Sequence, residues 1–201
     1  MKRIALAGGI GAGKSTAQGH LEQRGFPVID ADDVARAIVA PGKPAYVALR
    51  DAFGDAILAG DGTLDRAFLA EVVFHDAAAL ARLNAITHPR VGEEILARLA
   101  AAERDSAPVV FVALPLFRPE HRALFSLDGV WAIEVAPEVA LNRLVQSRHL
   151  SREDARSRLA AQMSNEERRA LADHVVINDG TIEDLAVRLD ELLVTEGLVR
   201  G

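Results

Sequence analysis

Short apolar runs alternate with longer amphipathic stretches along the chain. The runs are rich in Val and Ile and carry few polar residues, which is typical of strands buried in a parallel sheet. They predict strands at Ile4–Ala7, Val28–Ile29, Val109–Val112, Val130–Val135 and Val175–Ile177. Because helical patterns separate these runs, we expect an α/β fold, with a parallel five-stranded sheet and helices on both faces.

Several helix boundaries have clear sequence signals. A serine or threonine three residues before an acidic residue can form a capping box, in which each side chain bonds the other residue's backbone N–H. We predict N-cap residues at Ser151, at Ser164 with Glu167 and at Thr181 with Asp184. Pro137 suits the first turn of a helix that continues over Glu138–Val145. A further helix is expected over Ser15–Gln23, directly after the first strand.

The stretch between the second and third strands has no strand pattern. Its periodicity predicts helices at Val34–Val39, Ala45–Phe53, Arg66–Val73, Ala77–Ile86 and Val91–Ala102. The last two are expected to be separated at His88-Pro89, because a proline removes a helical hydrogen bond and disfavours helical backbone in the residue before it.

We interpret this stretch as a helical lobe inserted into one domain that spans residues 1–201. It is too long for a single crossover between two parallel strands. The lobe covers about residues 34–103, and the core covers about residues 1–33 and 104–201. Such a lobe beside a sheet is a candidate lid or acceptor-binding region.

Composition narrows the classes of partner. Half of the 201 residues are apolar, which is enough for a core. The net charge is −6 and no basic run is present, so neither nucleic acid nor an anionic membrane surface is an expected partner. The chain has no cysteine for disulfides or thiolate metal sites. The apolar run before Gly8 is too short for a secretion signal or a membrane span, so we expect a cytoplasmic protein, a monomer or small homo-oligomer.

Residues 8–15 are GGIGAGKS and match the phosphate-loop pattern G-x-x-x-x-G-K-[ST]. Glycines let the backbone wrap so that several N–H groups point at phosphate oxygens, and the following helix adds its positive end. The motif's lysine reaches the β- and γ-phosphates, and its serine hydroxyl binds Mg²⁺. The alternative is a glycine-rich turn without a ligand. We predict a nucleoside triphosphate site formed by Gly9, Gly11, Ala12, Gly13, Lys14, Ser15 and Thr16.

Three carboxylates follow the second predicted strand, in the stretch VIDADD. Like charges this close repel, so such a cluster needs positive charge or a functional partner nearby. In a phosphate-loop fold a carboxylate at this strand end can bind Mg²⁺ or take a proton from an attacking hydroxyl. Asp33 is predicted to cap the next helix. Asp30 and Asp32 are the functional candidates, and a solvated turn is the alternative.

An ordered series of motifs resembles the bacterial dephospho-coenzyme A kinase family. It comprises GGIGAGKST, VIDADDVAR, DGTLDRAFLAEVVF, LNAITHPRV, LPLF, RLVQSR, Gln162 and ADHVVINDGT. The resemblance implies a phosphate-loop kinase with a core sheet, a helical CoA-binding lobe and a lid over about residues 143–165. It also implies transfer of the γ-phosphoryl group of ATP to the ribose 3′-hydroxyl of dephospho-CoA, with Mg²⁺ as the cofactor.

The resemblance assigns catalytic roles by position. Asp32 matches the family's proposed base and Mg²⁺ partner, and Asp30 would support the turn. Transfer of a phosphoryl group requires positioning and positive charge around its oxygens. Arg143, on the helix after the fourth strand, and Arg148, in the loop before Ser151, are the candidate suppliers. The alternative for both is a surface arginine.

The resemblance also assigns binding roles. Arg36, Arg66 and His88 fall in segments that line the acceptor pocket in the family. The alternatives are a solvated helix residue for Arg36, an ion pair with a neighbouring carboxylate for Arg66, and a hydrogen-bonded helix terminus for His88. Asn178 and Gly180, in the turn after the last strand, resemble the family's contact to adenine, and an ordinary turn is the alternative.

The sequence departs from the family pattern at two important places. After the third strand, Pro119 stands where an acid is expected, and Glu120 follows one place later. In the lid, Ser147 stands where a second arginine is expected, and Arg148 follows one place later. On a helix one place is a rotation of about 100°. A phosphate-loop kinase for another small metabolite and a non-catalytic nucleotide-binding regulator therefore stay open as alternatives.

Overall fold

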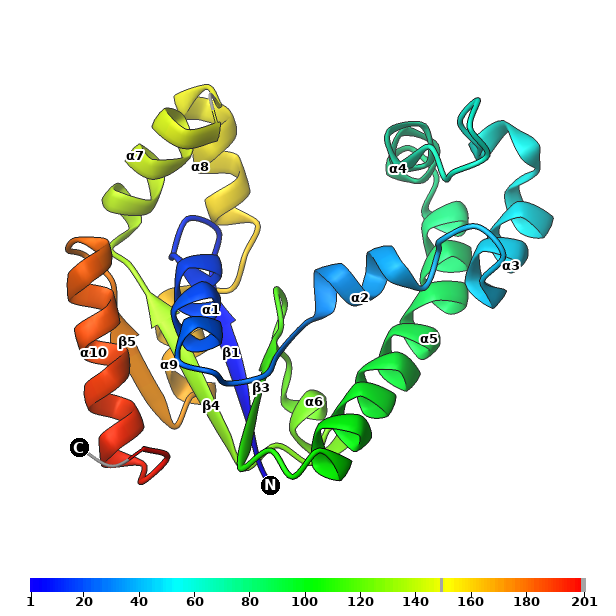
Figure 1. Cartoon of the computed structure of the whole chain (residues 1–201). Coiled ribbons are helices and arrows are strands. Elements are labelled where there is room, and N and C mark those ends of the chain that lie inside the picture. The colour runs from blue at the N-terminus through cyan, green and yellow to red at the C-terminus, as the bar shows by residue number, and fades with distance from the viewer. Residues whose placement is uncertain (149, 200–201) are drawn as a thin grey trace. The chain divides into compact units, whose positions relative to one another are not determined.

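The computed structural model describes residues 1–148 and 150–199 of the chain. Its strands form one parallel sheet in the order β2-β3-β1-β4-β5 (Figure 1). The strands are β1 (Lys2–Gly8), β2 (Val28–Asp30), β3 (Val109–Ala113), β4 (Gly129–Glu134) and β5 (His174–Ile177). The predicted parallel five-stranded sheet is thereby confirmed, and each strand lies within one or two residues of its expected bounds.

Helices connect the strands and extend the chain beyond the sheet. They are α1 (Lys14–Gln23), α2 (Ala31–Ala37), α3 (Pro44–Phe53), α4 (Arg66–Phe74), α5 (Ala77–Arg104), α6 (Pro119–Leu124), α7 (Pro137–Arg148), α8 (Arg152–Ala160), α9 (Asn165–Leu171) and α10 (Ile182–Thr195), with a short 3₁₀ turn η1 (Asp55–Ile57). The predicted capping boxes at Ser164 and Thr181 and the N-cap at Ser151 are confirmed. None of the described helices is long and apolar enough to cross a membrane.

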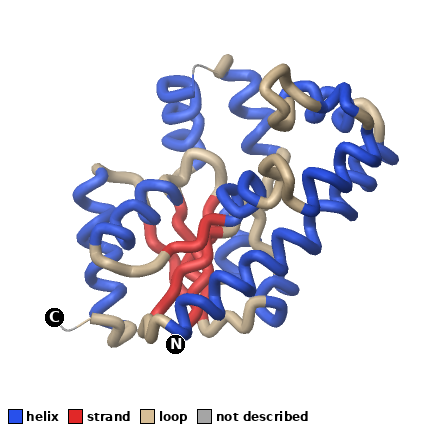
Figure 2. Tube along the Cα trace, turned by 45° about the vertical axis from the view of Figure 1, so that its right-hand side comes forward, coloured by secondary structure: helices blue, strands red, loops and turns tan. Residues whose placement is uncertain are grey.

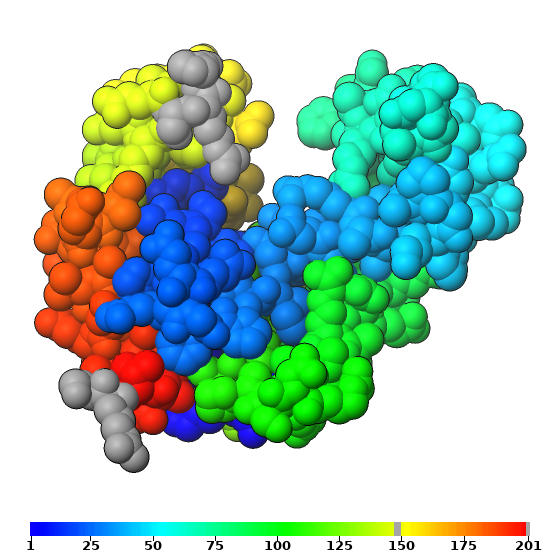
Figure 3. All heavy atoms as spheres, viewed as in Figure 1, coloured from blue at the N-terminus to red at the C-terminus, as the bar shows by residue number. Residues whose placement is uncertain are grey.

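The sheet lies between helices, as expected for buried parallel strands. Figure 1 shows α1 and α10 in front of the sheet and α9 behind it, and Figure 2 shows the same layering around the red strands. In the space-filling view of Figure 3, side chains of α1 and α10 cover this face. Alternate residues of the strands pack against the two helices, because successive side chains of a strand point to opposite faces. The cluster includes Ile4, Leu6, Leu21, Phe111, Trp131, Ile133, Leu189 and Leu193.

The described chain divides into two compact units. The first consists of Met1–Asp30 and Ala101–Gly201 and contains the sheet, whereas the second consists of Ala31–Ala100 and is helical. In the first unit the strands all run in the same direction, so their carboxyl ends meet at one edge of the sheet. Ligands of open parallel sheets bind at this edge.

The predicted break at His88-Pro89 is wrong, because α5 is one continuous helix with Pro89 inside it. The proline lacks the N–H that would bond the carbonyl four residues earlier. That carbonyl belongs to Ala85, and the carbonyl next to it, of Ile86, accepts from Arg90 Nη1 at 2.7 Å. His88 therefore lies within a helix and not at a helix terminus.

Two further differences concern helix starts. The predicted cap at Asp33 is wrong, because α2 begins at Ala31 and Asp33 lies in its first turn together with Asp32. Carboxylates in a first turn still stabilise a helix through its dipole. Helix α6 was not predicted. It starts where Pro119 departs from the family pattern, at a first-turn position that suits proline.

Candidate active site

The phosphate loop joins the end of β1 to the start of α1. Gly11 and Gly13 have φ angles of 74° and 91°, in the left-handed region that favours glycine. Gly13 is the N-cap of α1, and the loop is closed by a turn in which the Ala12 N–H donates to the Gly9 carbonyl at 3.1 Å. A Cβ at Gly11 would lie 3.2 Å from the carbonyl oxygen of Ala140. The glycines are therefore required by backbone angle and by close packing.

The side chains expected to bind the triphosphate follow in the first turn of α1. Lys14 and Thr16 are half-buried, and Ser15 is exposed. The first N–H groups of a helix have no partner within the helix, so they can bind an anion. The loop and this turn together contain backbone N–H groups, an ammonium group and hydroxyl groups, which is the donor set that a nucleotide's phosphates require.

Asn178 holds the phosphate loop through a side-chain hydrogen bond. Its side chain is only 6% exposed, and its Nδ2 donates to the Ala12 carbonyl at 2.8 Å. The contact with Gly13 is so close that an added Cβ there would lie 2.1 Å from Asn178 Nδ2. The predicted contact of Asn178 and Gly180 with adenine stays a prediction, but Asn178 has a structural role that the sequence did not indicate.

Arg143 reaches the same loop from α7. Its Nη1 donates to the Gly11 carbonyl at 3.4 Å, and its Nη2 donates to the Gly180 carbonyl at 3.3 Å. The guanidinium thus lies beside the predicted triphosphate site. The expected loop position of Arg148 is wrong, because α7 extends to this residue. The Arg148 side chain lies outside the described part of the structure.

The three carboxylates of VIDADD lie in different local settings. Asp30 is the last residue of β2, and its carboxylate accepts a hydrogen bond of 2.5 Å from Nε2 of the buried Gln18 in α1. Asp32 and Asp33 are exposed in the first turn of α2. Asp33 accepts from Arg36 Nη1 at 2.5 Å. The cluster is therefore separated by the change from strand to helix.

Two of the predicted acceptor residues are in contact within the helical unit. Arg66 Nη2 donates to the Arg36 carbonyl at 3.3 Å. The carboxylate next to Arg66 in sequence, Asp65, instead caps α4 by accepting from the Phe68 N–H at 2.9 Å. His88 is exposed near the middle of α5. The structure thus joins Arg36 to Arg66 and places His88 on a separate helix.

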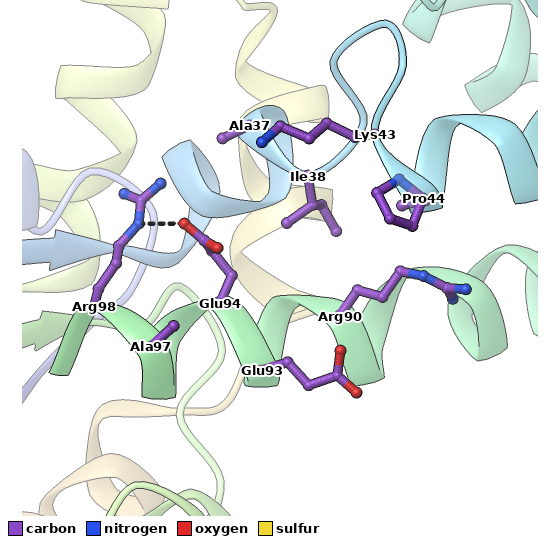
Figure 4. Close-up of a pocket in the computed structure, with 10 residues that line it drawn as sticks. Ala37, Ile38, Lys43, Pro44, Arg90, Glu93, Glu94, Ala97 and Arg98 are labelled. Atoms are coloured by element: carbon purple, nitrogen blue, oxygen red, sulfur yellow. Dashed lines mark hydrogen bonds and ion pairs between the residues drawn. The ribbon is translucent and has the colours of Figure 1, made fainter. Parts of the chain in front are cut away.

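The helical unit also contains a groove of about 470 Å³ between the α2–α3 connection and α5 (Figure 4). An ion pair between Arg98 and Glu94, both on α5, lies at one end with an Nε–Oε1 distance of 2.9 Å. The groove is lined by Ala37, Ile38, Lys43, Pro44, Ala45, Arg90, Glu93, Glu94, Ala97 and Arg98. None of the predicted acceptor residues belongs to this lining.

The segment after β3 lines a cavity beside the phosphate loop. The cavity is about 180 Å³, and Ala7, Gly8 and the residues from Pro115 to Arg118 form part of its wall. Glu120, one residue after the position where the family pattern has an acid, lies at the surface. Its Oε1 forms an ion pair with Arg118 Nη1 at 3.8 Å. Both side chains of this pair are exposed, so the ion pair contributes little to stability.

Two polar residues beside the phosphate loop, Gln162 and Arg168, have no role that their sequence context predicts. Gln162 Oε1 accepts from the Ile10 N–H at 2.8 Å. Arg168 is 8% exposed, and its Nη2 would lie 3.1 Å from a Cβ added to Gly9. Burial lowers the pKa of the Arg168 guanidinium, against the opposing effect of nearby Glu134 and Glu167. No local pattern distinguishes Arg168 from the exposed arginine beside it.

Comparisons with known proteins agree along nearly the whole chain. A sequence model of the dephospho-CoA kinase family matches residues 2–184. A dephospho-CoA kinase of Corynebacterium glutamicum is 46% identical over 193 residues, which cover 96% of each chain. The crystal structure of a Thermus thermophilus protein has a TM-score of 0.80 at 33% identity over 97% of both chains. A dephospho-CoA kinase from Campylobacter jejuni has a TM-score of 0.74 at 27% identity, covering 99% of this chain and all of the other.

Proposed function

Because the chain belongs to the dephospho-CoA kinase family, we propose that its phosphate loop, Arg143 and Asp32 carry out that family's reaction. The chain transfers the γ-phosphoryl group of ATP to the ribose 3′-hydroxyl of dephospho-CoA, which yields coenzyme A and ADP in the last step of coenzyme A synthesis. The observation that carries the assignment of residues is the loop between β1 and α1, with left-handed glycines and Lys14 at the helix start.

Stabilisation of charge on the transferred group is the first part of the proposal. We assign the ATP site to the loop from Gly9 to Gly13 and to Lys14, Ser15 and Thr16. Converging N–H groups and the Lys14 ammonium group hold the phosphates in line, and Arg143 adds positive charge as negative charge spreads over the γ-phosphoryl oxygens. The bonds of Arg143 to the Gly11 and Gly180 carbonyls support this assignment, because they hold the guanidinium at the loop. Arg148 is proposed as a second lid cation.

Activation of the acceptor is the second part. Asp32 takes the proton of the 3′-hydroxyl as the oxygen attacks, and Arg36, Arg66 and His88 bind the acceptor. The contact between Arg66 and the Arg36 carbonyl supports a shared role for these two. The helical lobe and the lid are proposed to serve acceptor binding and closure, respectively. A cytoplasmic location and a monomer or small homo-oligomer stay predictions.

The residues present fit Mg²⁺. The exposed Ser15 hydroxyl in the first turn of α1 and the exposed Asp32 carboxylate are hard oxygen donors, which this ion prefers. We propose that Ser15 and Asp32 hold the metal together with phosphate oxygens. When bound, Mg²⁺ supplies positive charge that shields the triphosphate.

The test is ADP release in a coupled assay, with and without dephospho-CoA. We expect ADP formation to depend on dephospho-CoA. Stimulation only by another alcohol would indicate a kinase for a different metabolite, and ATP binding without acceptor-dependent ADP would indicate a regulator.

The role of Asp32 is tested with Asp32→Asn. This variant should lower kcat at least about a hundredfold, on the scale of removing a general base, while ATP binding is retained. Asp33→Asn is the matched control, because it removes a carboxylate from the same helical turn, and its kcat should stay close to that of the unchanged protein. Normal turnover in Asp32→Asn would refute the base assignment.

A further inference from the structure

The connection between α8 and α9 is fixed to the sheet by a buried guanidinium. Asn165 Nδ2 donates to the carbonyl of Val135, directly after β4, at 2.9 Å. Arg168 Nη1 donates to Asn165 Oδ1 at 2.8 Å, and its Nη2 donates to the Met163 carbonyl at 2.6 Å. Arg168 is 8% exposed, so these bonds lie in a largely water-free environment where hydrogen bonds hold geometry well. The connection is therefore a rigid support.

Gln162 extends from this support to the phosphate loop. Its Oε1 accepts from the Ile10 N–H at 2.8 Å. The contact is close, because a Cβ on Gly9 would lie 3.3 Å from Gln162 Oε1 as well as 3.1 Å from Arg168 Nη2. A small cavity of about 100 Å³ lies at the same place, and Gln162 and Arg168 line it with Gly9 and Ile10. The loop therefore rests directly on this pair.

The contact between Gln162 and Ile10 joins the predicted lid segment to the phosphate loop. Gln162 follows α8, which packs on α7, and α7 carries Arg143 with its bond to the Gly11 carbonyl. The predicted lid segment, residues 143–165, thus contacts neighbouring residues of the phosphate loop near both of its ends. This segment therefore contacts the phosphate loop at Ile10 and at Gly11.

We propose that Gln162 is a positioning residue for ATP, which holds the Ile10 amide and thereby fixes the phosphate loop in its nucleotide-binding conformation. Glycine-rich backbone loses much conformational entropy when it is ordered, so a loop that is already held binds its ligand more tightly. Arg168 acts behind Gln162 by fixing the backbone from which that side chain extends. This proposal rests on the proposed function only in that ATP is the ligand of the loop.

The test compares two substitutions of similar size. Gln162→Met keeps the length of the side chain and removes the acceptor, which leaves the Ile10 N–H without its partner. We expect the Kd for ATP, measured by calorimetry without acceptor, to rise about five- to thirtyfold. The KM for dephospho-CoA should not change. Gln162→Glu keeps an oxygen that can accept from Ile10, so at high salt, which screens the added negative charge, it should bind ATP more tightly than Gln162→Met does.

The matched control is Gln23→Met, an exposed glutamine at the end of α1. Its Kd for ATP should equal that of the unchanged protein. An unchanged Kd in Gln162→Met would overturn the proposal, and so would equal weakening in Gln162→Glu at high salt. A parallel rise of both substrate constants with a lower unfolding midpoint would indicate a general structural role and would also overturn it. Failure of the unchanged protein to phosphorylate dephospho-CoA would instead refute the proposed function, because the ratio of ATP dissociation constants does not depend on turnover.

Discussion

Gly13, at the junction of the phosphate loop and α1, gives the strictest test of how the loop is built. Substitution by alanine introduces two separate penalties. The backbone at this N-cap has a φ of 91°, which residues with a Cβ rarely adopt. The new Cβ would also lie 2.1 Å from Asn178 Nδ2, far inside van der Waals contact. Asn178 must then move, and its bond to the Ala12 carbonyl is lost.

The two penalties have different sizes. The left-handed backbone costs about 1 kcal/mol for alanine relative to glycine. Asn178 is 6% exposed, so its displacement leaves a buried amide and the Ala12 carbonyl without partners, which costs about 2 kcal/mol. The free energy of unfolding should therefore fall by about 3 kcal/mol in Gly13→Ala.

Gly25 provides a matched control at the other end of the same helix. Its φ is 84°, but an added Cβ would have no neighbouring atom within 4 Å. Gly25→Ala should therefore show only the backbone penalty, about 1 kcal/mol. Urea unfolding of both variants gives the difference, which isolates the contact with Asn178.

A double-mutant cycle completes the test. In an Asn178→Ala background the obstructing amide is absent, so Gly13→Ala should cost little more than Gly25→Ala. Equal destabilisation by the two glycine substitutions would refute the reasoning, and so would full additivity of Gly13→Ala and Asn178→Ala.

Two further predictions concern stability away from the loop. Leu189 in α10 is completely buried against the sheet, so Leu189→Ala should lower the free energy of unfolding by about 3 kcal/mol, whereas Leu124→Ala, at a half-exposed position, should change it by less than about 0.5 kcal/mol. Asp190 accepts from Arg24 and His20, and chiefly the Arg24 bond holds the pKa of this carboxyl below its usual value. Its stabilisation is therefore complete above the pKa of an unfolded Asp, about 3.9, and is lost as the pH falls below that value. Asp190→Asn should flatten the fall of the urea midpoint below about pH 4, and an unchanged pH dependence would contradict this.

The sheet was predictable because its signals are local. The five apolar runs are buried on both faces, so their hydrophobicity is continuous and their limits are sharp. The capping boxes at Ser164 and Thr181 are equally local, since the two partners lie three residues apart. Parallel pairing follows from the alternation with helices. These predictions needed no knowledge of contacts between distant segments.

The continuous helix α5 was not predictable from local rules. Proline in a helix interior costs roughly 3 kcal/mol, so a break at Pro89 is the favoured expectation for an isolated segment. In the folded chain Ala79 lies buried before the proline, and Ile95 and Leu99 lie buried after it. Burial of two or three such side chains contributes several kcal/mol, which exceeds the penalty. Tertiary packing therefore decides the conformation at this point.

The candidate active site divides in the same way. The phosphate loop was identified from eight consecutive residues, because glycine, lysine and serine at fixed spacing have few other uses. The residues that hold it come from the opposite end of the chain. Gln162 lies 152 positions from Ile10, and Asn178 lies 166 positions from Ala12. The family resemblance includes both residues, but glutamine and asparagine occur everywhere on protein surfaces, so only the fold reveals their contacts with the loop. Because Gln162 and Asn178 contact the loop that we propose as the phosphate site, substitutions of these two residues should act on ATP binding before they act on the acceptor.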